Sequence, residues 1–223
     1  MNKNYLISTG GSGGHVIPAT ILYEHLIKER NVIISCDKRG LKYLEKNYEY
    51  KIVDTPKLNN ILFLPINLII FFLLTIKSFF LLKTKKIEKL FSTGGYMSLP
   101  VIFAARLLKL KIYLIEPNQV LGRANKFFLN SCIKIFCYTK EIKNFPNNFK
   151  DKMIKIEPLV RKSIYKLNPS LISKYKFNLL IIGGSQGANI FDKNLKNIIV
   201  NISKKFSIKI IQQTNEKNIT NLK

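Results

Sequence analysis

The sequence predicts an α/β protein built on parallel β-sheets, and three observations support this fold class. Short apolar runs alternate with segments long enough for helices, which is typical of strands buried on both faces and joined by crossover helices. Two glycine-rich turns, residues 10–15 (GGSGGH) and 183–188 (GGSQGA), each follow an apolar run and precede a helical pattern. Because this strand, turn and helix unit occurs twice, the sequence predicts two Rossmann-like domains in tandem.

The individual elements follow from the apolar runs. Strands of the first domain are predicted at 5–9, 32–36, 50–53, 90–92, 111–115 and 133–138, and one more at 153–156. A stretch with Pro158, Pro169 and weak periodicity suits an interdomain linker. The pattern restarts with a strand at 177–182, a helix at about 188–204 and a strand at 208–212. We therefore expect a first domain of residues 1–157, a linker of 158–176, and the start of a second domain at 177–223.

The charge of the chain favours an anionic partner. Its 223 residues include 37 Lys and Arg and 13 Asp and Glu, which gives a net charge of +24. Such a balance suits phosphate, nucleic acid or an acidic membrane surface. The chain is also crowded with Lys, Ile and Asn, so part of the charge is a compositional bias. Basic residues are not interleaved with aromatic ones in a recognisable nucleic-acid motif, which argues against a nucleic-acid-binding module.

The cysteine and histidine content excludes two classes of protein. Three cysteines without a CxxC pair cannot form a disulfide framework, and two histidines leave no zinc motif, so we expect no metal and no cofactor. The cysteine count suits a reducing cytoplasm. The chain reaches its first glycine turn by Gly10, which leaves no room for a signal peptide.

The first glycine turn is a candidate phosphate site. Glycines let backbone N–H groups approach a ligand closely, and the N-terminus of the following helix attracts anions. Ser12 adds a hydroxyl, and His15 closes the turn where a helix N-terminus favours a neutral imidazole able to take a proton. The alternatives are a tight strand-to-helix turn and a capping or packing histidine. His25, inside the helical pattern, is predicted to be a surface residue.

Two further turns follow predicted strands and belong to the same sheet edge. Residues 93–95 (TGG) follow one strand, and residues 116–118 (EPN) follow the next. Because parallel strands end at a common edge, His15, Glu116 and Asn118 are predicted to converge on one rim, as an active site on this architecture requires. The alternative for Glu116 is an ordinary turn.

Residues 61–82 form the most apolar segment, ILFLPINLIIFFLLTIKSFFLL. Its length allows a membrane span, but it lies between two strands of one predicted sheet, and a span would separate them. We favour a helix that is half core and half membrane-surface patch, with lysines meeting anionic headgroups. A plain core helix and a true span are the alternatives. The lysines concerned are Lys77, Lys83, Lys85 and Lys86.

The second glycine turn, with Ser185, is also compatible with phosphate. Arg161 lies in the predicted linker, where its planar guanidinium could hold a ligand phosphate. A solvated linker arginine is the alternative.

These motifs together resemble one family of bacterial peptidoglycan glycosyltransferases. GGSGGH, GGYMSLP at 94–100, EPN, PLVR at 158–161 and GGSQGA stand in that family's order and spacing. The resemblance implies a GT-B glycosyltransferase of tandem Rossmann-like domains, the second incomplete here, at the cytoplasmic face of the cell inner membrane as a peripheral protein. It implies transfer of N-acetylglucosamine from UDP-N-acetylglucosamine to the 4-hydroxyl of the muramyl sugar of lipid I, with inversion. Implied partners are UDP-N-acetylglucosamine, lipid I, an anionic membrane surface and proteins of cell-wall synthesis and division.

The resemblance also implies roles for single residues. His15 matches the family's loop histidine and is the candidate base, with Glu116 as its alternative or partner. Residues matching sugar-nucleotide-binding positions are Ser12, Gly13, Gly14, Asn118, Arg161 and Ser185. The family commonly has HEQNG and GNPVR where this chain has IEPNQ and EPLVR. Two other functions stay open: a non-catalytic acceptor half that needs a separate donor-binding chain, and a GT-B transferase acting on diacylglycerol.

Overall fold

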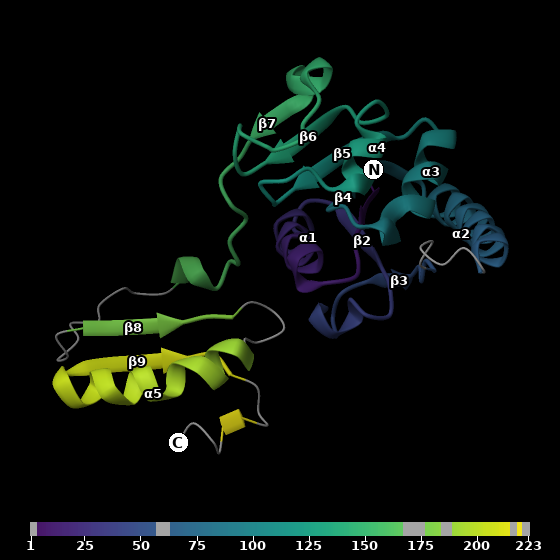
Figure 1. Ribbon diagram of the computed structural model, residues 1–223. Coiled ribbons are helices and arrows are strands. Elements are labelled where there is room, and N and C mark those ends of the chain that lie inside the picture. Colours follow the sequence, from purple (N-terminus) through teal and green to yellow (C-terminus); the bar gives the residue numbers. More distant parts are fainter. Residues whose placement is uncertain (1–3, 57–62, 167–176, 184–188, 215–217, 220–223) are drawn as a thin grey trace. The chain divides into compact units, whose positions relative to one another are not determined.

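The computed structural model describes residues 4–56, 63–166, 177–183, 189–214 and 218–219 (Figure 1). The chain divides into two compact units, residues 1–165 and 166–223. The division falls inside the stretch predicted as the linker. Ser185 lies outside the described residues.

The described part of the first unit contains a seven-stranded parallel sheet in the order β3-β2-β1-β4-β5-β6-β7. Its strands are β1 (Asn4–Ser8), β2 (Asn31–Cys36), β3 (Tyr50–Ile52), β4 (Ile87–Ser92), β5 (Lys111–Glu116), β6 (Lys134–Cys137) and β7 (Met153–Lys155). All the strands predicted for this unit are present. β4 begins three residues earlier than predicted, because Glu88 and Lys89 interrupt its apolar pattern. The order reverses between β1 and β4, which is where ligands bind at the carboxyl edge of such a sheet.

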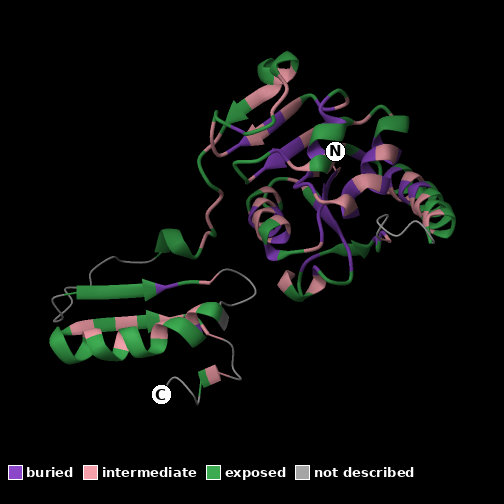
Figure 2. Ribbon diagram, in the orientation of Figure 1, coloured by how far each residue is buried: buried purple, intermediate pink, exposed green. Residues whose placement is uncertain are grey.

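Helices cover both faces of this sheet. α1 (Gly13–Leu26) packs on one face, while α2 (Leu64–Thr84), α3 (Leu99–Leu107) and α4 (Arg123–Phe128) pack on the other (Figure 1). Because side chains alternate along a strand, Leu6 of β1 enters the core of the second face and Ile7 that of the first. Both are completely buried, and most residues of β1, β2 and β5 are buried too (Figure 2). The 3₁₀ helices are η1 (Leu41–Tyr43), η2 (Tyr96–Ser98), η3 (Asn147–Lys152) and η4 (Ile164–Lys166).

α2 corresponds to the apolar segment predicted at 61–82, of which residues 61–62 lie outside the described part. Its inward side is mixed: Thr75, Ser78 and Leu82 are buried, and Leu74, Phe79 and Leu81 are partly buried against the core. Most of its other large apolar side chains are exposed, so the alternative of a plain core helix is wrong. β3 and β4 flank α2 and lie in one sheet, which a membrane-crossing helix could not connect. By length and composition alone α2 could cross a membrane, but the topology argues against it.

The second unit begins with the predicted strand, helix and strand. β8 (Phe177–Ile181) pairs in parallel with β9 (Ile208–Gln212), and α5 (Asn189–Lys205) connects them. Asp192 joins α5 to the chain after β9, because its carboxylate accepts hydrogen bonds from the side chains of Thr214, Asn218 and Gln212 at 2.6, 2.7 and 2.7 Å. These donors, Thr214 first, hold the pKa of the Asp192 carboxyl below its usual value.

Candidate functional site

The first glycine turn carries the chain from β1 into α1. Gly11 has φ +82°, a conformation that side chains rarely adopt. Ser12 is the N-cap residue, and its carbonyl oxygen accepts the N–H groups of His15 and Val16, both at 3.1 Å. The Ser12 side chain is exposed and makes no capping hydrogen bond to the helix. The helix therefore begins with unpaired N–H groups beside a hydroxyl, an arrangement that suits an anion.

His15 has a defined orientation at the start of α1. Its Nδ1 lies 2.8 Å from the carbonyl oxygen of Thr93. Because a carbonyl oxygen only accepts, Nδ1 must carry the hydrogen, and in the neutral ring Nε2 is then the atom that can take a proton. Gly95 lies next to the ring: a Cβ added to Gly95 would stand 3.8 Å from His15 Nε2.

The turn after β4 connects His15 with the neighbouring strands. The Thr93 N–H donates to the Ser8 carbonyl at 3.2 Å, and its hydroxyl donates to the Thr9 hydroxyl at 2.8 Å. Gly94 and Gly95 have φ values of +85° and +81°, so this tight turn requires both glycines. The turn thus lies directly beside the end of β1.

Glu116, at the end of β5, organises the turn that follows it. The side chain is only 1% exposed. One carboxylate oxygen accepts the backbone and side-chain N–H groups of Asn118 at 3.2 and 2.9 Å. The other accepts from the Gly122 N–H at 2.8 Å and the Asn125 side chain at 3.0 Å. A buried carboxylate that accepts four hydrogen bonds is better suited to positioning its neighbours than to exchanging a proton with substrate. We therefore favour a positioning role for Glu116.

These turns form one continuous group at the carboxyl edge. Gly94 lies against the Asn125 amide, since a Cβ on Gly94 would stand 3.1 Å from Asn125 Nδ2. A chain of contacts therefore runs from His15 through the Thr93–Gly95 backbone to Asn125, Glu116 and Asn118. The predicted convergence on one rim is confirmed. Asn118 is exposed at the end of this chain of contacts.

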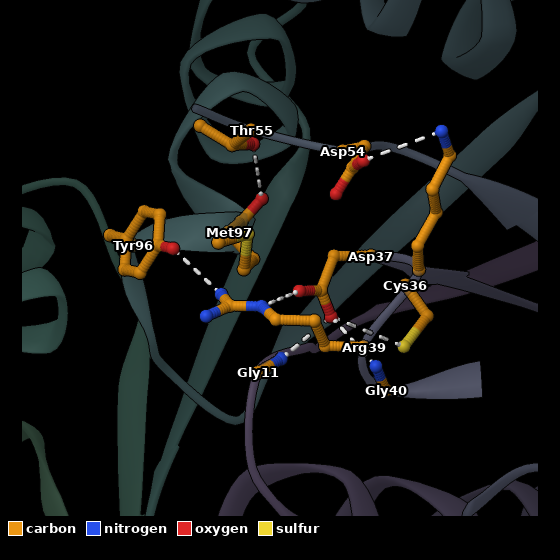
Figure 3. A network of polar contacts seen from close by, with 10 residues as sticks. Gly11, Cys36, Asp37, Arg39, Gly40, Asp54, Thr55, Tyr96 and Met97 are labelled. Carbon is orange, nitrogen blue, oxygen red and sulfur yellow. Dashed lines mark hydrogen bonds and ion pairs between the residues drawn. The ribbon is translucent and has the colours of Figure 1, made fainter. Parts of the chain in front are cut away.

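A second carboxylate at the same edge was not among the predicted site residues. Asp37 follows β2 directly and is completely buried (Figure 3). Its Oδ1 accepts the N–H groups of Gly11 and Gly40 at 2.7 and 3.1 Å, and its Oδ2 accepts from Arg39 Nε at 2.9 Å. Asp37 therefore fixes the first glycine turn to the end of β2. The rule that located Glu116, a polar residue directly after a strand, would also have located Asp37.

The remaining candidate residues, Arg161 and His25, do not belong to this group of turns. Arg161 is exposed in the first unit. Its neighbours lie along α1: Lys162 Nζ donates to the Glu24 carbonyl, and His25 Nε2 contacts the Val160 carbonyl at 3.5 Å. His25 is exposed, as predicted. Within the described residues no group of three His, Cys, Asp or Glu side chains could hold a metal ion.

Comparison with curated proteins finds relatives across the whole chain. A protein of Pelagibacter ubique named UDP-N-acetylglucosamine–N-acetylmuramyl-(pentapeptide) pyrophosphoryl-undecaprenol N-acetylglucosamine transferase is 51% identical over 225 residues, covering 100% of this chain and 63% of that protein. A protein of the same name from Rickettsia canadensis is 36% identical, covering 95% of this chain and 61% of its own length. The chain thus spans just under two thirds of these relatives.

Solved structures show the same fold. The crystal structure of MurG from Acinetobacter baumannii superposes with a TM-score of 0.73 at 22% identity, over 99% of this chain and 63% of that one. A glycosyltransferase from Rickettsia africae gives a TM-score of 0.68 at 15% identity, over 99% of this chain and 70% of that one. The predicted GT-B fold class is confirmed.

The family profile described as the glycosyltransferase family 28 N-terminal domain matches residues 5–137. These residues contain β1 to β6 and the three turns around His15, Thr93 and Glu116. Because this match covers more than half of the chain, the chain belongs to glycosyltransferase family 28.

Proposed function

We propose that this chain is the acceptor-binding part, with the beginning of the donor-binding part, of a transferase that makes lipid II from lipid I. The reaction moves N-acetylglucosamine from UDP-N-acetylglucosamine to the 4-hydroxyl of the muramyl sugar, with inversion. The observation that carries the proposal is the 51% identity over the whole chain to a protein named for this activity. The geometry of the carboxyl edge supports it, because it supplies a base and an anion-binding turn side by side.

His15 is the base in this proposal. With Nδ1 directed to the Thr93 carbonyl, Nε2 takes the proton of the acceptor hydroxyl while its oxygen attacks the anomeric carbon. UDP leaves with its charge stabilised by helix N-termini and hydroxyl groups. Glu116 acts as a partner rather than as an alternative base, because its four hydrogen bonds hold Asn118 and Asn125 in place.

The sugar nucleotide is held first of all by residues at the carboxyl edge of the first unit. Asn118 is exposed beside Glu116, and Ser12, Gly13 and Gly14 form the start of α1. Arg161 and Ser185 complete the set by resemblance to the family. We propose these six residues as donor-binding.

We also propose that α2 binds the cytoplasmic face of the inner membrane as a peripheral element. Its outward side chains are large and apolar: Ile66, Leu68, Ile69, Phe72, Leu73 and Phe80 are 50–64% exposed. This apolar surface continues to Phe127 of α4, 62% exposed, through ring contacts of Phe103 with Phe71 and Phe127, both at 5.7 Å. One side that packs on the core and an exposed, apolar outward side suit a helix that faces lipid.

Charge supports the same placement. Lys77 and Lys83 are exposed on α2, and Lys86 is exposed two residues after its end, so cations accompany the apolar surface. Each is worth about 1 kcal/mol near anionic headgroups. Lys85 contributes less, because its Nζ pairs with Glu49 at 3.1 Å. Proteins of cell-wall synthesis and division are the partners we expect at this surface.

The proposal is tested with a chimera that joins this chain to the remaining third of the Pelagibacter ubique relative. Purified chimera is supplied with labelled UDP-N-acetylglucosamine and either a lipid I analogue or diacylglycerol. We expect transfer to the lipid I analogue alone. Transfer to diacylglycerol would establish a different glycolipid transferase. No transfer by a folded chimera, with retained binding of the lipid I analogue, would establish a non-catalytic acceptor half.

A further inference from the structure

The contacts of Arg39 mark it as a ligand-binding residue that the motifs do not reveal. Arg39 follows β2 at the carboxyl edge of the sheet. Its Nη2 lies beside the first glycine turn, since a Cβ added to Gly11 would stand 4.0 Å from that atom. The guanidinium is thus next to the start of α1.

The guanidinium is held in one orientation by two partners, Asp37 after β2 and Tyr96 of η2 (Figure 3). Its Nε donates to the buried Asp37 carboxylate at 2.9 Å, and its Nη2 donates to the Tyr96 hydroxyl at 2.6 Å. It also lies 5.6 Å from the centre of the Tyr96 ring. A side chain fixed in this way loses little conformational freedom when it binds a ligand.

Arg39 keeps most of its donor capacity. An arginine carries five N–H donors, and the two hydrogen bonds that the described residues make with this guanidinium use two of them. The side chain remains 49% exposed, whereas Asp37 is completely buried and already bound by two backbone N–H groups. The negative partner therefore faces inward, and a fork of free N–H groups faces solvent, which is the geometry that binds phosphate bidentately.

We infer that Arg39 binds the diphosphate group of the lipid acceptor. The inference rests on the proposed function, which supplies two diphosphates, one in UDP-N-acetylglucosamine and one in lipid I. The acceptor is favoured because α2, where we place the lipid, belongs to the same unit as Arg39, and because Arg39 is not among the residues that we assign to the donor. A helix that follows a parallel strand begins at the carboxyl edge, so α2 starts on the side of the sheet where Arg39 lies. A lipid held against α2 would present its diphosphate at this edge.

The test measures equilibrium binding of three probes to the 223-residue chain. The probes are a short-chain prenyl-diphosphoryl muramyl pentapeptide, the same muramyl pentapeptide without diphosphate, and UDP-N-acetylglucosamine. The variants are Arg39→Gln, Arg39→Lys and, as a matched control, Lys38→Gln, which removes one charge from the adjacent residue with a side chain 73% exposed. Thermal unfolding of each variant verifies that it is folded.

We expect Arg39→Gln to weaken binding of the diphosphoryl probe about tenfold or more, the loss of a charge-assisted contact. Arg39→Lys should lose less, and Lys38→Gln nothing. Binding of the other two probes should not change, which a merely structural role for Arg39 would not explain.

The other outcomes separate this inference from the proposed function. If the wild-type chain binds the diphosphoryl probe and Arg39→Gln binds it equally, the inference is wrong and the proposed function stands. An equal loss with Lys38→Gln, or a loss confined to UDP-N-acetylglucosamine, also overturns the inference. If the wild-type chain does not bind the diphosphoryl probe at all, the proposed function fails, and the inference that rests on it fails with it.

Discussion

Glu116 and Asp37 have the same role at two ends of the site. Glu116 ends β5 and Asp37 directly follows β2, and each is buried and accepts hydrogen bonds from backbone N–H groups of a neighbouring turn. A buried carboxylate in this position fixes the geometry of the turn. Its side chain does not occupy the solvent side of the sheet edge, where a ligand would bind. The exposed residues that surround it, Asn118 beside Glu116 and Arg39 beside Asp37, are then free to meet a ligand.

Glu116→Gln tests this positioning role. The variant places an amide NH₂ against donors from Asn118, Gly122 and Asn125, so one buried donor faces another. We expect a loss of about 1–3 kcal/mol in the free energy of unfolding, measured with urea. Glu141→Gln, at an exposed carboxylate, is the control and should change little. An unfolding free energy equal to that of the wild type would show that the network does not need the charge.

The proposed roles of Arg161 and Ser185 in donor binding can be tested by enzyme kinetics. In the chimera, Arg161→Ala and Ser185→Ala should raise the KM for UDP-N-acetylglucosamine with smaller effects on kcat, because both contacts are expected in the ground state. Steady-state kinetics with each substrate varied in turn distinguishes an effect on donor binding from an effect on acceptor binding. If only the KM for the acceptor rises, the assignment of these residues to the donor is wrong.

Two buried cysteines should lower the stability of the first unit at alkaline pH. Burial, and then the neighbouring carboxylates of Asp37 and Glu116, raise the pKa of Cys36 and of Cys137 from 9.0 to about 12. The native state thus keeps two protons that the unfolded chain releases above pH 9. The free energy of unfolding should therefore fall between pH 9 and about 12, by up to about 1.4 kcal/mol per pH unit for each thiol.

Urea unfolding at a series of pH values measures this response. A Cys36→Ala, Cys137→Ala double variant is less stable at neutral pH because it leaves cavities, but its stability should decline less steeply above pH 9. Parallel curves for the wild type and the double variant would mean that the thiols do not contribute to the decline.

At the scale of elements, β1, β2 and β5 could be predicted because they are largely buried on both faces and therefore mostly apolar. The convergence of the three turns then followed from parallel topology. The hydrogen bonds that give Asp37 and Arg39 their positions could not be predicted, because they join residues 26 and 57 positions apart. The outward orientation of α2 was also open, since an apolar helix with little amphipathic pattern fits a core, a surface or a bilayer equally.

α2 should bind anionic vesicles through its outward face. Replacing Ile69, Phe72 and Leu73 by Ser removes three exposed apolar side chains, each worth about 1.5–3 kcal/mol when buried. We expect sedimentation with phosphatidylglycerol vesicles to be lost, and high salt to release part of the wild-type protein. Phe71 and Phe79 are left intact, because they pack on Phe103 and on the core.

The control is Ile27→Ser, at an exposed apolar residue after α1 that should not affect vesicle binding. Alkaline carbonate should extract the wild-type protein from isolated membranes. Retention in the carbonate pellet, with a tag after Lys223 accessible from the periplasm, would show a span and contradict the single-sheet topology.

At the scale of the whole molecule, the described residues contain a seven-stranded unit and a strand, helix and strand of a second unit. The first unit carries His15, the three turns and the apolar face of α2, which we propose as the acceptor side of the reaction. Transfer additionally requires a donor pocket, and the chain spans 63% of its Pelagibacter ubique relative. We therefore expect the 223-residue chain alone to bind acceptor and to transfer no sugar.

The central claim is that the carboxyl edge of the first unit performs the transfer, with His15 as its base. The most direct test is the steady-state rate of the chimera and of its His15→Ala variant with a lipid I analogue. We predict that the kcat of the variant falls about 10²–10⁴-fold, as general-base loss does, while its KM for UDP-N-acetylglucosamine changes little. An unchanged kcat in a folded variant would contradict the account and reduce His15 to a residue that shapes the turn.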